Sequence, residues 1–166
     1  EYAVIAGIRR RLEVAHIKLA HSRVFLVVAY PLQTHEMLFD AHARGFAAFG
    51  GVPRRGIYDN MKTAVDKVGR GKERTVNARF QAMSGHYLFE PDFCNKAAGW
   101  EKGIVEKNVQ DRRRQLWANA NNRHWPSLEA LNDWLAGECR AAWQDMRHPA
   151  CPDLTLQSVL EDEQPH

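Results

Sequence analysis

Apolar residues near the start of the chain recur in three short runs of the kind that form β-strands. The runs cover residues 3–8, 12–19 and 23–30, and in the second run apolar positions alternate between two faces. The breaks between the runs are short enough for hairpins, so the pattern predicts an antiparallel meander, which ends at Pro31.

The spacing of apolar residues then changes to that of helices. Thr34 is expected to cap a helix that continues to Gly50 and Gly51, where left-handed backbone commonly ends a helix. The other predicted elements are, in chain order, a strand over 54–59, a loop over 66–75, a helix over 77–87, a strand over 88–91, a helix over 98–117, a loop over 118–126 and a helix that Ser127 caps.

This order of elements predicts an α/β fold. Three antiparallel strands followed by two strands reached through helices favour a ribonuclease H-like mixed five-stranded sheet, three strands antiparallel and then two parallel, flanked by helices. Residues 1–146 are expected to form this core, truncated at its N-terminus. Residues 147–166 carry three prolines and an acidic cluster, which are typical of a linker or tail toward a further C-terminal domain.

Composition narrows the class of protein. A chain of 166 residues with 45% hydrophobic positions is enough for one packed core, and a net charge of +3 favours an anionic partner only mildly. The positive charge is clustered, and such clusters can converge on one face and follow a phosphate backbone, or simply solvate the surface. The clusters are Arg9–Arg11, Arg54–Arg55, the run from Lys67 to Arg74 and Arg112–Arg114.

Other classes of protein are disfavoured. The cysteines Cys94, Cys139 and Cys151 are too few and too far apart for a disulfide framework, and no CxxC pair or zinc-ligand spacing exists. No apolar run approaches the roughly 20 residues of a membrane span, and no signal-peptide pattern opens the chain. We therefore expect a cytoplasmic protein with reduced thiols. Because the chain opens at Glu1 in what reads as a strand, we also expect a piece of a longer protein.

Two acidic residues occupy positions that suggest metal chemistry. Asp59 lies at the C-terminal end of the fourth predicted strand, where ligands bind in open α/β sheets, and Glu106 lies in a helix that can pack against that edge. Converging carboxylates bind Mg²⁺ or Mn²⁺, and paired ions activate phosphodiesters. Each residue alone has a plainer explanation: an Asp-Asn turn for Asp59, and an ion pair with Lys102 for Glu106.

Taken together, these residues resemble the integrase-type catalytic core of bacterial insertion-sequence transposases of the IstA type. The resemblance rests on AFGGVPRRGIYDNMKTAV, NARFQAMSGHYLFEP and GWEKGIVEKNV, and VAHIKLAHSRVFLVVAYP is similar to the second and third strands of that core. In that family a D-D-E triad binds the catalytic metals. Asp59 matches the second aspartate and Glu106 the glutamate. Asp40 and Asp66 fall in the wrong elements for the first aspartate, which we expect just upstream of Glu1.

The resemblance implies a polynucleotidyl transferase. The full-length enzyme would use two Mg²⁺ or Mn²⁺ ions to cleave DNA at the transposon ends and to join them to target DNA, whereas the present chain, without the first aspartate, should be inactive. The resemblance also implies a helper ATPase of the same element, self-association and the bacterial cytoplasm. Candidate DNA contacts near the triad are Lys62, Lys102, Lys107 and Arg113, although capping, solvation or helix-surface ion pairs explain such residues almost as well.

Two alternatives stay open at this point. One is a metal-dependent nuclease of the same fold, because hydrolysis and strand transfer can share one site. The other is a non-catalytic DNA-binding or assembly module in which the carboxylates are structural.

Overall fold

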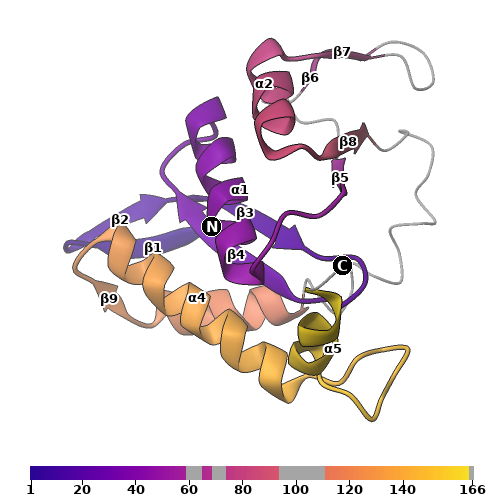
Figure 1. The fold of residues 1–166 in the computed structure, drawn as a ribbon. Coiled ribbons are helices and arrows are strands. Elements are labelled where there is room, and N and C mark those ends of the chain that lie inside the picture. The colour runs from indigo at the N-terminus through magenta and orange to yellow at the C-terminus, as the bar shows by residue number, and fades with distance from the viewer. Residues whose placement is uncertain (59–64, 69–73, 94–110, 165–166) are drawn as a thin grey trace.

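A computed structural model describes residues 1–58, 65–68, 74–93 and 111–164 of the chain (Figure 1). Its strands are β1 Tyr2–Ile5, β2 Ile8–Arg11, β3 Glu13–Lys18, β4 Phe25–Tyr30, β5 Arg55–Tyr58, β6 Val65–Val68, β7 Arg74–Val76, β8 Glu90–Phe93 and β9 His124–Trp125. Its helices are α1 His35–Phe49, α2 Ala78–Tyr87, α4 Leu128–Asp145 and α5 Leu156–Glu163, and residues 111–121 form a further helical segment.

The first hairpin turns earlier than the sequence predicted. Ala6 and Gly7 both have positive φ, 49° and 80°, which is the backbone of a two-residue hairpin turn that matches strand twist. β1 therefore pairs with β2, with Ile5 opposite Ile8, and not with the run 12–19. The strand predicted over 12–19 is shorter in the structure: β3 spans Glu13–Lys18, and Leu12, which precedes it, is buried.

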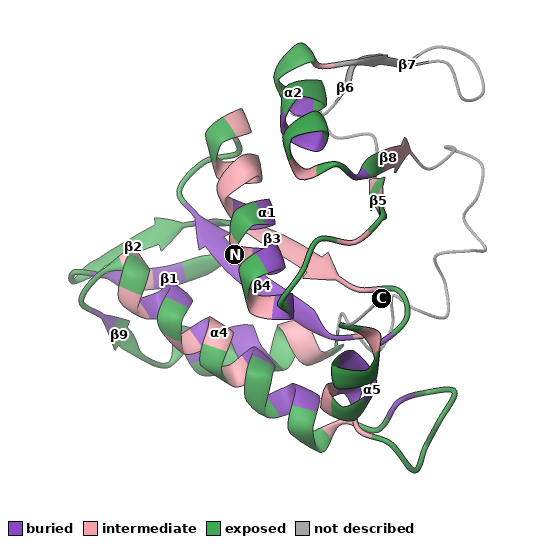
Figure 2. Ribbon diagram, viewed as in Figure 1, coloured by how far each residue is buried: buried purple, intermediate pink, exposed green. Residues whose placement is uncertain are grey.

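The central pair of strands agrees with the prediction. β3 pairs antiparallel with β4 from Glu13–Tyr30 to Lys18–Phe25, and every residue of β4 is buried between helices on both sides (Figure 2). The predicted start and end of α1 are also confirmed: the Thr34 side chain accepts a hydrogen bond from the Met37 amide, and Gly50 ends the helix at φ 76°.

Helix α4 lies along β4, and two of its polar side chains form hydrogen bonds with backbone groups of that strand. The Asn132 amide accepts a hydrogen bond from the Ala29 N–H at 2.7 Å and donates to the Ala29 carbonyl at 3.0 Å. The Trp143 indole donates to the Phe25 carbonyl at 2.8 Å. These bonds satisfy backbone groups of a buried strand that would otherwise lack partners, and thereby fix α4 along β4.

The later strands form a separate parallel pair. β5 pairs with β8 from Arg55–Glu90 to Tyr58–Phe93, as the predicted crossover requires. This pair and α2 pack on α1 through a second apolar cluster, which contains Phe46, Phe80, Met83 and Phe89. The predicted helix over 77–87 is confirmed by α2, whose cap is Asn77.

The single five-stranded sheet predicted from the sequence is not confirmed. The described strands form four hydrogen-bonded groups, in the orders β2-β1-β9, β3-β4, β5-β8 and β6-β7. Among these strands, β3 and β5 each pair on one side only, and a cavity of about 510 Å³ is lined by β3, β5 and α1. The sheet is split because no described strand lies between β3 and β5.

Three further segments differ from the prediction. The loop predicted over 66–75 contains parts of β6 and β7, which pair antiparallel. In place of a loop over 118–126, the helical segment continues to residue 121, and β9 then pairs parallel to β1 and buries Trp125. In the tail, α5 contributes Leu156 and Leu160 to the main core, so this part of the expected linker is folded onto the domain. No helix within the described ranges is long and apolar enough to cross a membrane.

Candidate metal and nucleic-acid site

The residues predicted to carry the chemistry lie mostly outside the described part of the structure. These are Asp59, Glu106, Lys62, Lys102 and Lys107, so their mutual geometry stays a prediction. Within the described residues, no group of three or more His, Cys, Asp or Glu side chains could hold a metal ion. The described residue that directly precedes Asp59 is Tyr58, at the end of β5.

Tyr58, the residue before Asp59, is anchored to α1 by a hydrogen bond. His42 is only 6% exposed, and its Nδ1 lies 2.7 Å from the Leu38 carbonyl oxygen. Because a carbonyl only accepts, Nδ1 carries the proton and the Tyr58 hydroxyl donates to Nε2, also at 2.7 Å. Burial lowers the pKa of His42 and raises that of Tyr58, so both groups stay neutral near pH 7.

Aromatic rings enclose this hydrogen bond. The His42 ring stacks on Phe89 at an interplanar angle of 6°, and the Tyr58 ring meets Phe80 edge-on with ring centroids 5.0 Å apart. Phe93, opposite Tyr58 in the β5–β8 ladder, lies 5.8 Å from it, centroid to centroid. Contacts from three elements therefore fix the last residue of β5, and with it the point from which Asp59 follows.

The importance of His42 and Tyr58 was missed in the sequence. The available signal was weak: a tyrosine directly before the candidate aspartate, and a histidine at a core-facing position of the predicted helix, one turn after Leu38. Nothing in the spacing of the two residues indicates that their side chains meet.

Arg113 is the one predicted DNA contact that the structure describes. Its guanidinium lies 3.6 Å from the Glu1 carboxylate, with both side chains 36% exposed, and its Nε is buried without a hydrogen-bond partner. It also lies close enough to affect His16 of β3: burial, followed by the charges of Arg113 and Lys18, lowers the pKa of His16 to about 4. Arg113 thus has contacts inside the domain, and its contact with DNA stays a prediction.

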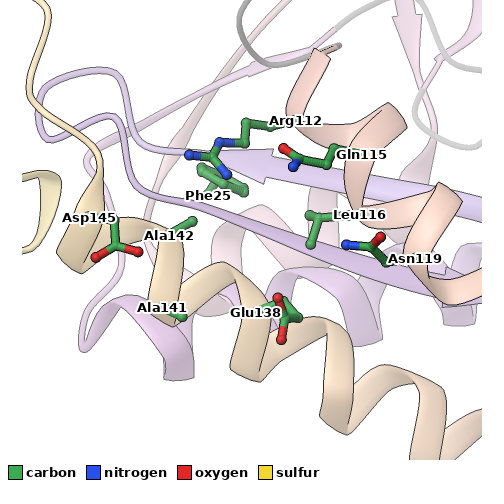
Figure 3. Close-up of a pocket in the computed structure, with 9 residues that line it drawn as sticks. All are labelled: Phe25, Arg112, Gln115, Leu116, Asn119, Glu138, Ala141, Ala142 and Asp145. Carbon is green, nitrogen blue, oxygen red and sulfur yellow. The ribbon is translucent and has the colours of Figure 1, made fainter.

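A small pocket lies between the helical segment 111–121 and α4 (Figure 3). Its volume is about 120 Å³, with Phe25 and Leu116 among its apolar lining residues. Its polar lining residues are Arg112, Gln115, Asn119, Glu138 and Asp145. Their mixed charge and the small volume do not fit an anionic substrate, so we do not assign this pocket to the chemistry.

The fold is α/β and is that of integrase catalytic cores, which are ribonuclease H-like. The chain superposes on a chain of the simian T-cell lymphotropic virus intasome with a TM-score of 0.60, covering 95% of this chain and 58% of that one at 14% identity. It superposes on the HTLV-2 integrase catalytic core, solved with magnesium, with a TM-score of 0.56, covering 89% and 92% at 14% identity. No protein-family model matches the chain.

Sequence comparison identifies the relatives. The chain is 58% identical over 164 residues to a transposase for insertion sequences IS1326/IS1353 of Pseudomonas aeruginosa, covering 99% of this chain and 32% of that protein. It is 61% identical over 148 residues to a transposase of Aminobacter aminovorans, covering 89% and 29%. A transposase for insertion sequence element IS21 of P. aeruginosa is 36% identical over 136 residues, covering 80% and 34%.

The resemblance to insertion-sequence transposases is therefore confirmed over nearly the whole chain, and the chain spans about a third of the length of the relatives it matches.

Proposed function

We propose that the full-length protein is a metal-dependent DNA transposase that cleaves phosphodiesters at transposon ends and transfers the strands to target DNA. The observation that carries this proposal is the position of Asp59. It follows directly on an anchored strand end, in a fold that integrase cores share, and the chain is similar to transposases. Strand ends of open α/β sheets are where ligands bind.

Asp59 and Glu106 would hold the metal. Their carboxylate oxygens suit hard ions such as Mg²⁺ or Mn²⁺, and the HTLV-2 integrase core was solved with magnesium. Two such ions, when bound, stabilise the entering and leaving oxygens of a phosphodiester. In this proposal Lys62, Lys102, Lys107 and Arg113 bind the DNA backbone and hold it against the two carboxylates.

The third carboxylate of the site is proposed to lie on a strand that precedes Glu1. The backbones of Glu1 and Leu12 exchange two hydrogen bonds, of 2.8 and 3.0 Å, which extend the β1–β2 ladder to the start of β3. In this register the residue before Glu1 would lie opposite Glu13, and the residues before it would follow the unpaired edge of β3 into the cavity that β5 also lines. A strand there would run past the end of β5.

The remaining parts of the proposal concern the whole protein. It would act in the bacterial cytoplasm on transposon ends and target DNA, as a homo-oligomer and with a helper ATPase of the same element. The simian virus neighbour, whose structure is that of an intasome, supports an assembly of several copies on DNA.

The test compares full-length protein with its Asp59→Asn and Glu106→Gln variants in a strand-transfer assay with Mg²⁺ or Mn²⁺. Each variant should lose joining while it keeps DNA binding and folds normally. Asp92→Asn is the matched control, because Asp92 is a carboxylate on the neighbouring strand β8 that pairs with Arg55. Joining at the wild-type rate by either variant contradicts the assignment of that residue, whereas cleavage without joining by the wild type points to the nuclease alternative.

The present chain alone should neither cut nor join DNA with either metal, because one of three carboxylates would be missing. Activity of the 166-residue chain contradicts the proposed third ligand.

A further inference from the structure

Strand β2 exposes a cluster of arginines to which the proposed chemistry gives no role. All four of its residues, Ile8 to Arg11, are exposed (Figure 2). Three of the four are arginines, and β2 pairs only with β1 among the described strands. A short edge strand with this composition either serves to bind an anion or protects its own edge.

Strand pairing places two of these arginines on one face with neighbours from β1 and β9. Arg9 lies opposite Val4, Arg11 lies opposite Tyr2, and Val4 lies opposite His124 on its other side. Directly opposed residues share a face of a sheet. The alternating residues of β1, Ala3 and Ile5, are buried at 0% and 7% exposure, so this is the outer face. We call Tyr2, Val4, Arg9, Arg11 and His124 the outer basic face.

On the outer basic face, the Arg9 guanidinium is positioned by an aromatic ring that leaves its charge unneutralised. The Arg9 guanidinium lies over the Tyr2 ring, 4.7 Å from its centroid, and Tyr2 itself is 46% exposed. Such stacking positions a guanidinium and leaves its hydrogen-bond donors available. Arg9 and Arg11 emerge about 6.8 Å apart, because they are two residues apart on an antiparallel strand.

The cluster on β2 has no acidic partner in the described part of the chain. Arg44, Arg55 and Arg79 each pair with an aspartate or a glutamate. By contrast, none of Arg9, Arg10 and Arg11 forms an ion pair with a described carboxylate, Glu13 included, although Glu13 is only two residues from Arg11. The positive potential of this strand is therefore available to an external anion.

We propose that the outer basic face binds the phosphate backbone of duplex DNA. Two guanidiniums without acidic partners among the described residues suit neighbouring phosphates of one DNA strand, and because phosphate contacts carry no sequence information, binding should be independent of sequence. The β1–β2 hairpin lies on the opposite side of the molecule from β5 and β8 (Figure 1). The face therefore contacts DNA away from the end of β5, and this inference does not depend on the role of Asp59.

The experiment measures binding of the 166-residue chain to a fluorescent duplex of arbitrary sequence by anisotropy, over a range of salt concentrations. The test variant is Arg9→Ala with Arg11→Ala. The control is Arg140→Ala with Arg147→Ala, two exposed arginines elsewhere whose loss changes the net charge equally. A third variant, Arg9→Lys with Arg11→Lys, keeps the charge.

Loss of two phosphate contacts should weaken binding by about tenfold or more at low salt and reduce the slope of log K against log salt by about 1.8. The control variant should change the affinity and the salt slope far less, and the lysine variant should keep the wild-type slope. Unfolding midpoints should stay unchanged, because both side chains are exposed.

The proposal is overturned if the test variant binds as the wild type does, or loses no more affinity than the control. It is also overturned if the test variant self-associates while its DNA affinity is unchanged, because the arginines then only protect the edge of β2. Asp59→Asn in the same binding assay should have no effect, so failure of this inference is distinguishable from failure of the catalytic proposal.

Discussion

Replacing Tyr58 by phenylalanine tests whether the hydrogen bond to His42 holds the end of β5. The change removes one hydroxyl and keeps the ring, so the contacts with Phe80 and Phe93 remain and no large cavity forms. What is lost is the 2.7 Å hydrogen bond to Nε2 of a histidine that is 6% exposed. Leaving a buried acceptor without a partner costs about 1–3 kcal/mol, and we expect the free energy of unfolding to fall by that amount.

Tyr87→Phe is the matched control for this change. Tyr87 packs edge-on against Phe46 in the same aromatic cluster, 4.9 Å between ring centroids, and its hydroxyl has no hydrogen-bond partner among the described residues. Loss of this hydroxyl should change the free energy of unfolding by less than about 0.5 kcal/mol. The measurement is urea unfolding of both variants at pH 7.5, compared at an unchanged m-value.

The two variants should also differ in function. In the full-length protein Tyr58→Phe should slow strand transfer more than Tyr87→Phe does, because Asp59 follows Tyr58 directly. If Tyr58→Phe destabilises the protein no more than Tyr87→Phe, the hydrogen bond does not anchor β5, and the reasoning is refuted.

Two further predictions concern the core. Asn132→Ala should lower the free energy of unfolding by about 2–4 kcal/mol, because the Ala29 N–H and carbonyl both lose their partner, whereas the same change at exposed Asn119 should have little effect in urea unfolding. Because of His16, the free energy of unfolding should fall as the pH drops from about 6.5 toward about 4. Its folded-state pKa is depressed, so the unfolded chain binds the proton first, and His16→Gln should unfold with a weaker dependence on pH over this window.

Local patterns determined much of the architecture. The bounds of α1 follow from Thr34 and Gly50, and the start of α4 follows from Ser127, because capping depends on residues within one turn of the helix end. The antiparallel pairing of β3 with β4 follows from alternation and a short connection. For the candidate site, the order of elements and the chemistry of carboxylates singled out Asp59 and Glu106 as a prediction. Whether the two side chains approach one another depends on contacts that no local pattern specifies.

Tertiary structure decided the features in which distant segments meet. The strand at His124–Trp125 forms because Trp125 is buried and its carbonyl accepts a hydrogen bond from the Ala6 N–H, although its sequence resembles a loop. Asn132 is a core residue only because Ala29, 103 positions earlier, presents an unpaired backbone to it. Tyr58 anchors β5 only because α1 brings His42 to its hydroxyl. A sequence specifies the hydrogen-bonding capacity of each side chain, whereas packing determines which partner satisfies it once both are removed from water.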